Sequence, residues 1–281
     1  MRHVRPNLII IGAQKSGTTS LWDNLRQHPE IFMCQPKEPC FFAFDTLYSR
    51  GWDWYSSLFN PVTHETIAGE ASTHYSMTQT WPKAPLRIAQ HLPTAKIIYI
   101  VRDPLERLRS AWLQFISCNY PIPWSFSKAI REYPPLLDGS MYWRTLSAYR
   151  EHFDDSQILL LFFEDLKSDT HLLNTKCFRF LDVDDGFEVS DAENIRYRTA
   201  GRKMERPIVS RIRRVPGSSF LRSVLPHRVA RNVRDNWARV RLPEKPAWNP
   251  RIKQWAVDQI KEDAHDFLNY AGKPLDFWGL H

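Results

Sequence analysis

The sequence predicts an α/β fold in three layers, with a central parallel sheet of about five strands and helices on both faces. Three observations support this prediction. Apolar runs without polar alternation lie at Leu8–Ile11, Lys96–Val101 and Ile158–Phe163, as is typical of parallel strands buried on both faces. Segments of helical character separate these runs. A loop rich in glycine and hydroxyl side chains follows the first run, as in P-loop-like folds that hold phosphate at a helix N-terminus.

Strands and helices alternate in the first part of the chain. Leu8–Ile11 is a buried strand by composition, and Thr18–Gln27 is a helix that ends at a His-Pro pair, because proline disfavours a helical conformation in the residue before it. The aromatic segment that follows includes a helix at Trp52–Leu58. We expect a short strand at Thr66–Gly69 and a short helix at Leu86–His91, shortly before a proline.

The same alternation continues in the second part. The strand Lys96–Val101 leads into a helix at Pro104–Ile116, since proline suits the first helical position. Met141–Phe153 has helical spacing of its apolar side chains, and Ile158–Phe163 is an all-apolar strand. Two further helices and a C-terminal segment that packs back are expected at Thr170–Leu181, Pro250–Tyr270 and Leu275–Trp278.

The composition indicates one globular domain over residues 1–281. Apolar residues make up 43% of the chain, enough for a large core. The net charge of +7 suits an anionic ligand, nucleic acid or a membrane surface. Much of this charge lies in 196–241, a segment that contains many arginines and only two acidic residues, Glu205 and Asp235. We expect 196–249 to be a basic, irregular segment over the binding site.

The cysteine pattern and the absence of targeting signals favour a cytoplasmic location. The four cysteines form no C-x-x-C pair and have no zinc-type spacing, so reduced thiols are expected. There is no signal-peptide core and no run of about 20 apolar residues that could cross a bilayer. We therefore expect a cytoplasmic protein without a membrane span, or a soluble domain of a larger protein.

The loop from Gly12 to Ser20 is the most informative motif. A nucleoside-triphosphate P-loop has lysine directly after its second glycine, but here Thr18 follows Gly17, and the lysine stands two places earlier, at Lys15. The loop is therefore suited to phosphate but presents its cation differently. The expected phosphate contacts are Lys15, Ser16, Gly17, Thr18, Thr19 and Ser20.

A second candidate anion site follows the strand Lys96–Val101. Arg102 comes directly after this strand, and Ser110 lies in the helix behind it. Because the carboxyl ends of parallel strands meet at one edge of a sheet, the two sites should be neighbours. A ligand that bridges them carries two separated phosphates, as adenosine 3',5'-bisphosphate does. The alternative for Arg102 is an ion pair with Asp103 or Glu106.

These motifs resemble those of the sulfotransferase family, which uses 3'-phosphoadenosine 5'-phosphosulfate (PAPS). Lys15–Thr19 is similar to the family's 5'-phosphosulfate loop, and Val101–Ser110, about 85 residues later, to its 3'-phosphate motif. Lys37–Phe42 resembles a Lys-Glu-Pro-His-Phe-Phe segment of the heparan sulfate branch, with Cys40 in place of histidine. Further similar segments are Gly69-Glu70, Asp138–Ser140 and Phe277-Trp278.

The resemblance implies a role for each of these residues in sulfuryl transfer by in-line displacement. Lys15 would stabilise the leaving phosphate, and Glu38 would act as general base. Glu70 and His74 are the alternatives for the base. Arg102 and Ser110 would hold the 3'-phosphate, and the basic loop Gly201, Arg202 and Lys203 would close over the nucleotide. No metal is expected, because lysine, arginine and N–H groups can neutralise the charge that develops.

The acceptor is expected to be a small molecule, a lipid or a carbohydrate, with an anionic acceptor or carrier as a further option at the basic segment. Phe42, Trp112, Tyr142 and Trp143 are expected to shape its pocket. The alternatives to this function are a P-loop nucleotide kinase, which needs Mg²⁺ and has no use for the second anion site, and a basic nucleic-acid-binding protein. The chain has no zinc-finger or RNP motif, so we expect no nucleic-acid partner.

Overall fold

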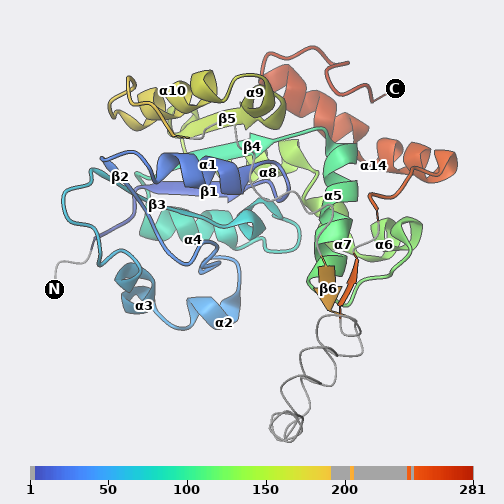
Figure 1. Cartoon of the computed structure of the whole chain (residues 1–281), viewed down its shortest axis with the longest axis horizontal. Helices are drawn as coiled ribbons and strands as arrows, with labels where there is room; N and C mark the ends of the chain where they lie inside the picture. Colours follow the sequence, from blue (N-terminus) through green and yellow to red (C-terminus); the bar gives the residue numbers. More distant parts are fainter. Residues whose placement is uncertain (1–3, 191–202, 206–238, 242–243, 281) are drawn as a thin grey trace, which may run out of the picture.

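A five-stranded parallel sheet forms the centre of the molecule (Figure 1). A computed structural model describes residues 4–190, 203–205, 239–241 and 244–280. The strand order is β2-β3-β1-β4-β5. This arrangement confirms the predicted fold class. The strands are β1 (Leu8–Gly12), β2 (Ile31–Met33), β3 (Ile67–Ala71), β4 (Lys96–Val101) and β5 (Ile158–Phe162).

Helices cover both faces of the sheet, which explains why its strands are apolar throughout (Figure 1). Ile9 and Ile11 of β1 join one apolar cluster, whereas Leu8 and Ile10 join the other, as the period of two in a strand requires. The first cluster is covered by α4 (Ala84–His91), α5 (Pro104–Ser117), α8 (Tyr142–Arg150) and α14 (Pro250–Tyr270). The second is covered by α1 (Thr18–Leu25), α9 (Phe163–Ser168) and α10 (Thr170–Leu181).

Several short elements were not predicted. The strand β2 lies at the sheet edge beside β3. The predicted strand Ile158–Phe163 ends one residue early, because α9 begins at Phe163. The predicted helix at Trp52–Leu58 is confirmed as α3 (Trp52–Ser57). The other additional elements are α2 (Asp45–Tyr48), η1 (Thr73–Ser76), α6 (Phe126–Glu132), α7 (Pro134–Asp138) and η2 (Asp155–Gln157).

The described parts of the basic segment lie beside α5. Two short strands, β6 (Lys203–Glu205) and β7 (Arg239–Arg241), pair antiparallel, and β6 contacts α5. After β7 the chain runs along α5, where Arg109 Nε donates to the carbonyl of Pro246 (2.7 Å) and Lys245 pairs with Glu106. The chain therefore returns to the helix that carries Ser110.

The C-terminus packs back onto the core, as predicted. Asn249 caps α14 by accepting hydrogen bonds from the N–H groups of Arg251 and Ile252. The indole of Trp278 is buried and stacks on Phe267, with ring centroids 6.2 Å apart. Among the described residues, no helix is both long enough and apolar enough to cross a bilayer.

Candidate active site

The glycine loop joins β1 to α1, and only glycine fits at position 17. Gly17 precedes the first residue of α1 with a φ of 93°, a conformation that residues with a Cβ rarely adopt. A Cβ at this position would lie 2.7 Å from Leu166 Cδ2 and 2.9 Å from Phe163 Cδ2. The loop therefore packs against α9, and the first N–H groups of α1 lack acceptors within the helix.

The residues just before Gly17 supply donors of the kind that an anion needs. Lys15 has a φ of 71°, and its Nζ lies 3.5 Å from Gln114 Oε1 of α5. The hydroxyl of Ser16 is buried and has no hydrogen-bond partner among the described residues. A buried donor without a partner is costly unless a ligand or water satisfies it. The loop thus fits a phosphate or sulfate group.

Arg102 connects the two predicted anion sites. Its Nη1 donates to the carbonyl of Lys15 (3.1 Å), and its guanidinium carbon lies 4.6 Å from the centroid of the Phe163 ring. The alternative ion pair does not form within the described part of the chain. Asp103 instead caps α5 by accepting from the Glu106 N–H (2.9 Å), and Glu106 pairs with Arg109 and Lys245.

Ser110 lies on the face of α5 that is turned toward the glycine loop. It stands four residues before Gln114, and side chains at this spacing share one helix face. Gln114 reaches the Lys15 ammonium, so this face of α5 is turned toward the glycine loop. The residues of the two candidate anion sites therefore lie close together at the carboxyl ends of β1 and β4.

Glu38 lies beyond the carboxyl end of β3. Its N–H donates to the carbonyl of Ala71 (3.1 Å), which fixes the loop to that strand. The carboxylate Oε1 accepts hydrogen bonds from Lys37 Nζ (2.9 Å) and Thr73 Oγ1 (3.4 Å). The side chain is 36% exposed, so it can reach a bound acceptor.

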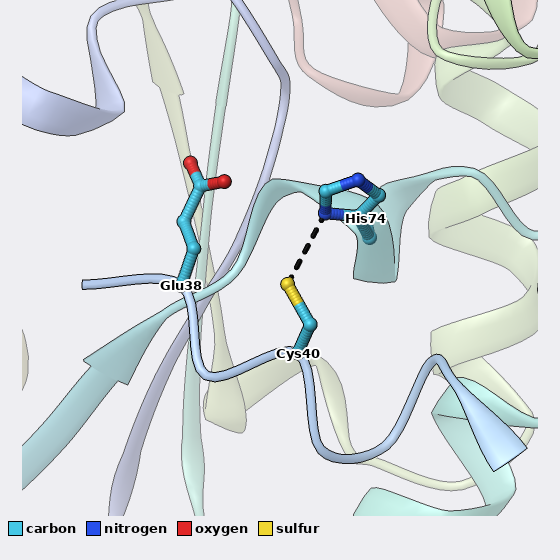
Figure 2. Close-up of side chains that lie close together, drawn as sticks. All are labelled: Glu38, Cys40 and His74. Carbon is cyan, nitrogen blue, oxygen red and sulfur yellow. Dashed lines mark hydrogen bonds between the residues drawn. The ribbon is translucent and has the colours of Figure 1, made fainter. Parts of the chain in front are cut away.

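His74 and Cys40 face each other beside Glu38 (Figure 2). The Cys40 Sγ lies 3.2 Å from His74 Nδ1, and the imidazole packs against the rings of Phe44 and Trp81. Burial lowers the pKa of His74 and raises the pKa of Cys40 to about 12. The imidazole is therefore neutral and the thiol protonated at neutral pH.

Glu70 does not fit the role of the base. It is fully buried, and its carboxylate accepts hydrogen bonds from Tyr55 (3.0 Å), Tyr75 (2.8 Å) and Ser72 (2.6 Å). The Ser72 hydroxyl in turn accepts the N–H of Cys40 (3.0 Å). Glu70 therefore holds the loop that carries Cys40 in place through the Ser72 hydroxyl.

Glu70 is also expected to make stability depend on pH. Burial raises its pKa from 4.5 to about 7, so between these pH values the folded chain keeps a proton that the unfolded chain has lost. The free energy of unfolding should therefore fall as pH rises through this window, by about 3 kcal/mol relative to Glu70→Gln. Urea titrations across the window measure this difference. Exposed Glu151→Gln is the control, and wild type and Glu70→Gln curves that stay parallel would contradict the prediction.

The base candidates and the glycine loop lie at one edge of the sheet. A Cβ on Gly12 would lie 2.2 Å from the Ser76 hydroxyl, so η1, which carries Thr73 and His74, packs directly on the start of the glycine loop. Backbone strain gathers here as well. Of the five described non-glycine residues with positive φ, three are Lys15, Glu38 and Cys40, and such strain is typical of functional loops.

The comparison with known proteins assigns the family. The model of the family described as "Sulfotransferase domain" matches residues 5–209, which is most of the chain. The chain belongs to the sulfotransferase family. This membership removes the support for a P-loop nucleotide kinase and agrees with the lysine placed before Gly17.

Curated relatives of this sulfotransferase include enzymes with different names. The membrane-associated sulfotransferase kil1 of Dictyostelium discoideum is 33% identical over 156 residues, which cover 53% of this chain and 32% of that protein. Mouse heparan sulfate glucosamine 3-O-sulfotransferase 3A1 is 34% identical over 172 residues, covering 58% of this chain and 42% of that protein. The chain spans less than half the length of these curated relatives.

A solved structure shares the fold of this sulfotransferase over its whole length. The sulfotransferase from Alicyclobacillus acidocaldarius superposes with a TM-score of 0.70 at 22% identity, covering 98% of this chain and 99% of that one. At this level of identity the likeness concerns the fold, and it agrees with the three-layer arrangement predicted from the sequence.

Some predicted site residues lie in the core of the protein, and others lie outside the residues that the structure describes. Gly201 and Arg202 fall outside the described residues, whereas Lys203 begins β6. Sequence reasoning missed Gln114, although its spacing from Ser110 was a usable signal. The prediction of an aromatic acceptor pocket was wrong for three side chains, which are buried in the core: Phe42, Trp112 and Tyr142. Trp143 is half-buried, and the exposed aromatic side chains near α5 are instead Tyr120 and Trp124.

Proposed function

We propose that this sulfotransferase transfers a sulfuryl group from PAPS to a hydroxyl or amine of an acceptor by in-line displacement. The observation that carries the proposal is the hydrogen bond from Arg102 to the Lys15 carbonyl, 3.1 Å long. It brings together two cationic sites that follow neighbouring strands, and one nucleotide with separated 5' and 3' phosphates uses both. Family membership supports the same donor.

Residues of the glycine loop act on the donor side. The N–H groups at the start of α1 and the hydroxyls of Ser16, Thr18, Thr19 and Ser20 hold the 5'-phosphate. Lys15 stabilises the negative charge that develops on this phosphate as the sulfuryl group departs. Gln114 keeps the Lys15 ammonium on the α5 side of the loop. Arg102 and Ser110 hold the 3'-phosphate, and the loop at Gly201, Arg202 and Lys203 closes over the nucleotide.

Glu38 acts on the acceptor side as general base. It takes the proton of the attacking hydroxyl or amine, and its hydrogen bonds from Lys37 and Thr73 orient the carboxylate. His74 is the second candidate, because its neutral imidazole can also accept a proton. The reaction requires no metal in this proposal, since Lys15 and the N–H groups neutralise the developing charge.

The acceptor is proposed to be a small molecule, a lipid or a carbohydrate. The exposed rings of Tyr120 and Trp124, 44% and 52% exposed, offer flat surfaces at the end of α5 on which a sugar or an apolar group can stack. The name of the mouse relative points to a glucosamine acceptor for that enzyme. An anionic acceptor or carrier would suit the basic segment. A cytoplasmic location and the absence of a nucleic-acid partner stay predictions.

Binding of adenosine 3',5'-bisphosphate tests the proposal. We expect this nucleotide to raise the melting temperature in the absence of Mg²⁺, and ATP with Mg²⁺ to have little effect. Arg102→Ala should weaken its binding, and raise the KM for PAPS, by about 10- to 100-fold, because a charge-assisted contact is lost. Exposed Arg251→Ala on α14 is the control. Equal affinity in wild type and Arg102→Ala would refute the 3'-phosphate site, and labelled PAPS with a panel of acceptors tests the transfer itself.

A further inference from the structure

Three side chains beside the proposed donor site form a cluster that the sulfuryl-transfer chemistry does not fully use. Glu38, Cys40 and His74 each offer one ligand atom, and these atoms all lie within 4.8 Å of one another. Figure 2 shows the thiol and the imidazole facing each other, with Glu38 on the same loop as Cys40. A thiol, an imidazole and a carboxylate form a donor set that zinc binds in proteins.

The separations are close to those of a tetrahedral zinc site. With metal–ligand bonds of about 2.0–2.3 Å, neighbouring ligand atoms lie about 3.5 Å apart. The Cys40 Sγ and His74 Nδ1 are already 3.2 Å apart, so this pair needs almost no movement. The three ligand atoms lie within 4.8 Å of one another, so Glu38 must approach by about 1 Å, which its partly exposed side chain can do by rotation.

The surroundings hold the ligands in place. The imidazole of His74 packs against the rings of Phe44 and Trp81, which restricts its movement. The Cys40 N–H is held by Ser72. Lys37 and Thr73 both donate to Oε1 of Glu38, so Oε2 is the oxygen left for a cation. Outer-shell hydrogen bonds of this kind orient metal ligands in other proteins.

We propose that Glu38, Cys40 and His74 bind one zinc ion or a similar borderline-soft divalent cation. The site has three protein ligands and one open position, and the thiol proton is released to solvent when the metal binds. The cation is not a cofactor of the reaction. Because it occupies the Glu38 carboxylate, which is proposed to accept the acceptor's proton, the cation inhibits transfer, and this consequence rests on the proposed function.

Cobalt(II) binding to the full chain tests the site without measuring activity. We expect one equivalent of Co²⁺ to give an absorption band from thiolate-to-cobalt charge transfer, and Zn²⁺ to displace it. Cys40→Ser should abolish the band and weaken Zn²⁺ binding by more than the roughly 10- to 100-fold that loss of an outer-shell partner costs. Exposed Cys118→Ala is the control, because this more accessible thiol is the first alternative ligand.

A second variant guards against a folding defect, since Cys40 is buried. Glu38→Gln changes an exposed side chain and should keep the thiolate band but lower the affinity for Zn²⁺. Absence of the band in wild type, or its survival in Cys40→Ser, would overturn the site. Zinc binding that leaves sulfuryl transfer unaffected supports the site and counts against Glu38 as the base, so the two proposals can fail separately.

Discussion

Replacing Lys15 with alanine is expected to lower kcat for sulfuryl transfer by about 100- to 1000-fold, because one donor to the developing negative charge is lost. The Lys15 ammonium lies beside Gln114 of α5, and the backbone carbonyl of Lys15 accepts a hydrogen bond from Arg102. The substitution removes the first contact and keeps the backbone that makes the second. The chain should therefore fold normally and still bind adenosine 3',5'-bisphosphate.

Single-turnover kinetics with labelled PAPS measure the chemical step, and melting curves report on folding. Lys128→Ala is a matched control, because this lysine side chain is 61% exposed on α6 and pairs only with Glu132 among the described residues. Lys15→Arg should recover part of the rate, since it keeps the charge but changes its position. A variant Lys15→Ala with wild-type kcat would remove Lys15 from the mechanism.

The long strands could be predicted because burial on both faces requires apolar residues at every position. β1 and β4 are buried on both faces, so no polar residue alternates along Leu8–Ile11 or Ile97–Val101. The three-residue strand β2 carries no such pattern, and its pairing with β3 is fixed by tertiary contacts. At Phe163 an apolar residue continues the strand pattern, yet the chain already turns into α9.

The neighbourhood of Lys15 and Arg102 could be predicted from topology, whereas their contact could not. The carboxyl ends of parallel strands gather at one edge, which places both residues there. The bond itself joins a side chain to a backbone carbonyl, and a carbonyl has no sequence signature. Cys40 and His74 are 34 positions apart. Tertiary contacts bring them together: η1 packs against β1, and the Cys40 N–H donates to the Ser72 hydroxyl.

Replacing Glu38 with glutamine is expected to lower the transfer rate by about 100- to 10,000-fold, the usual contribution of a general base. Glutamine has nearly the same shape, so its carbonyl oxygen can still accept from Lys37 and Thr73. It cannot take a proton. Binding of adenosine 3',5'-bisphosphate should therefore be unchanged, because the proposed nucleotide contacts lie on the glycine loop, at Arg102 and on α5.

The decisive comparison is between Glu38→Gln and His74→Ala, measured by kcat with saturating PAPS and by nucleotide binding. Glu132→Gln on α6 is the control for loss of a partly exposed carboxylate. If Glu38 is the base, Glu38→Gln loses transfer and keeps nucleotide affinity, while His74→Ala, which removes a ring packed on Phe44 and Trp81, has the smaller effect on kcat. A fully active Glu38→Gln together with an inactive, folded His74→Ala would assign the general base to His74. The rest of the proposed site would stand, because both groups lie at the same edge of the sheet and only the identity of the proton acceptor would change.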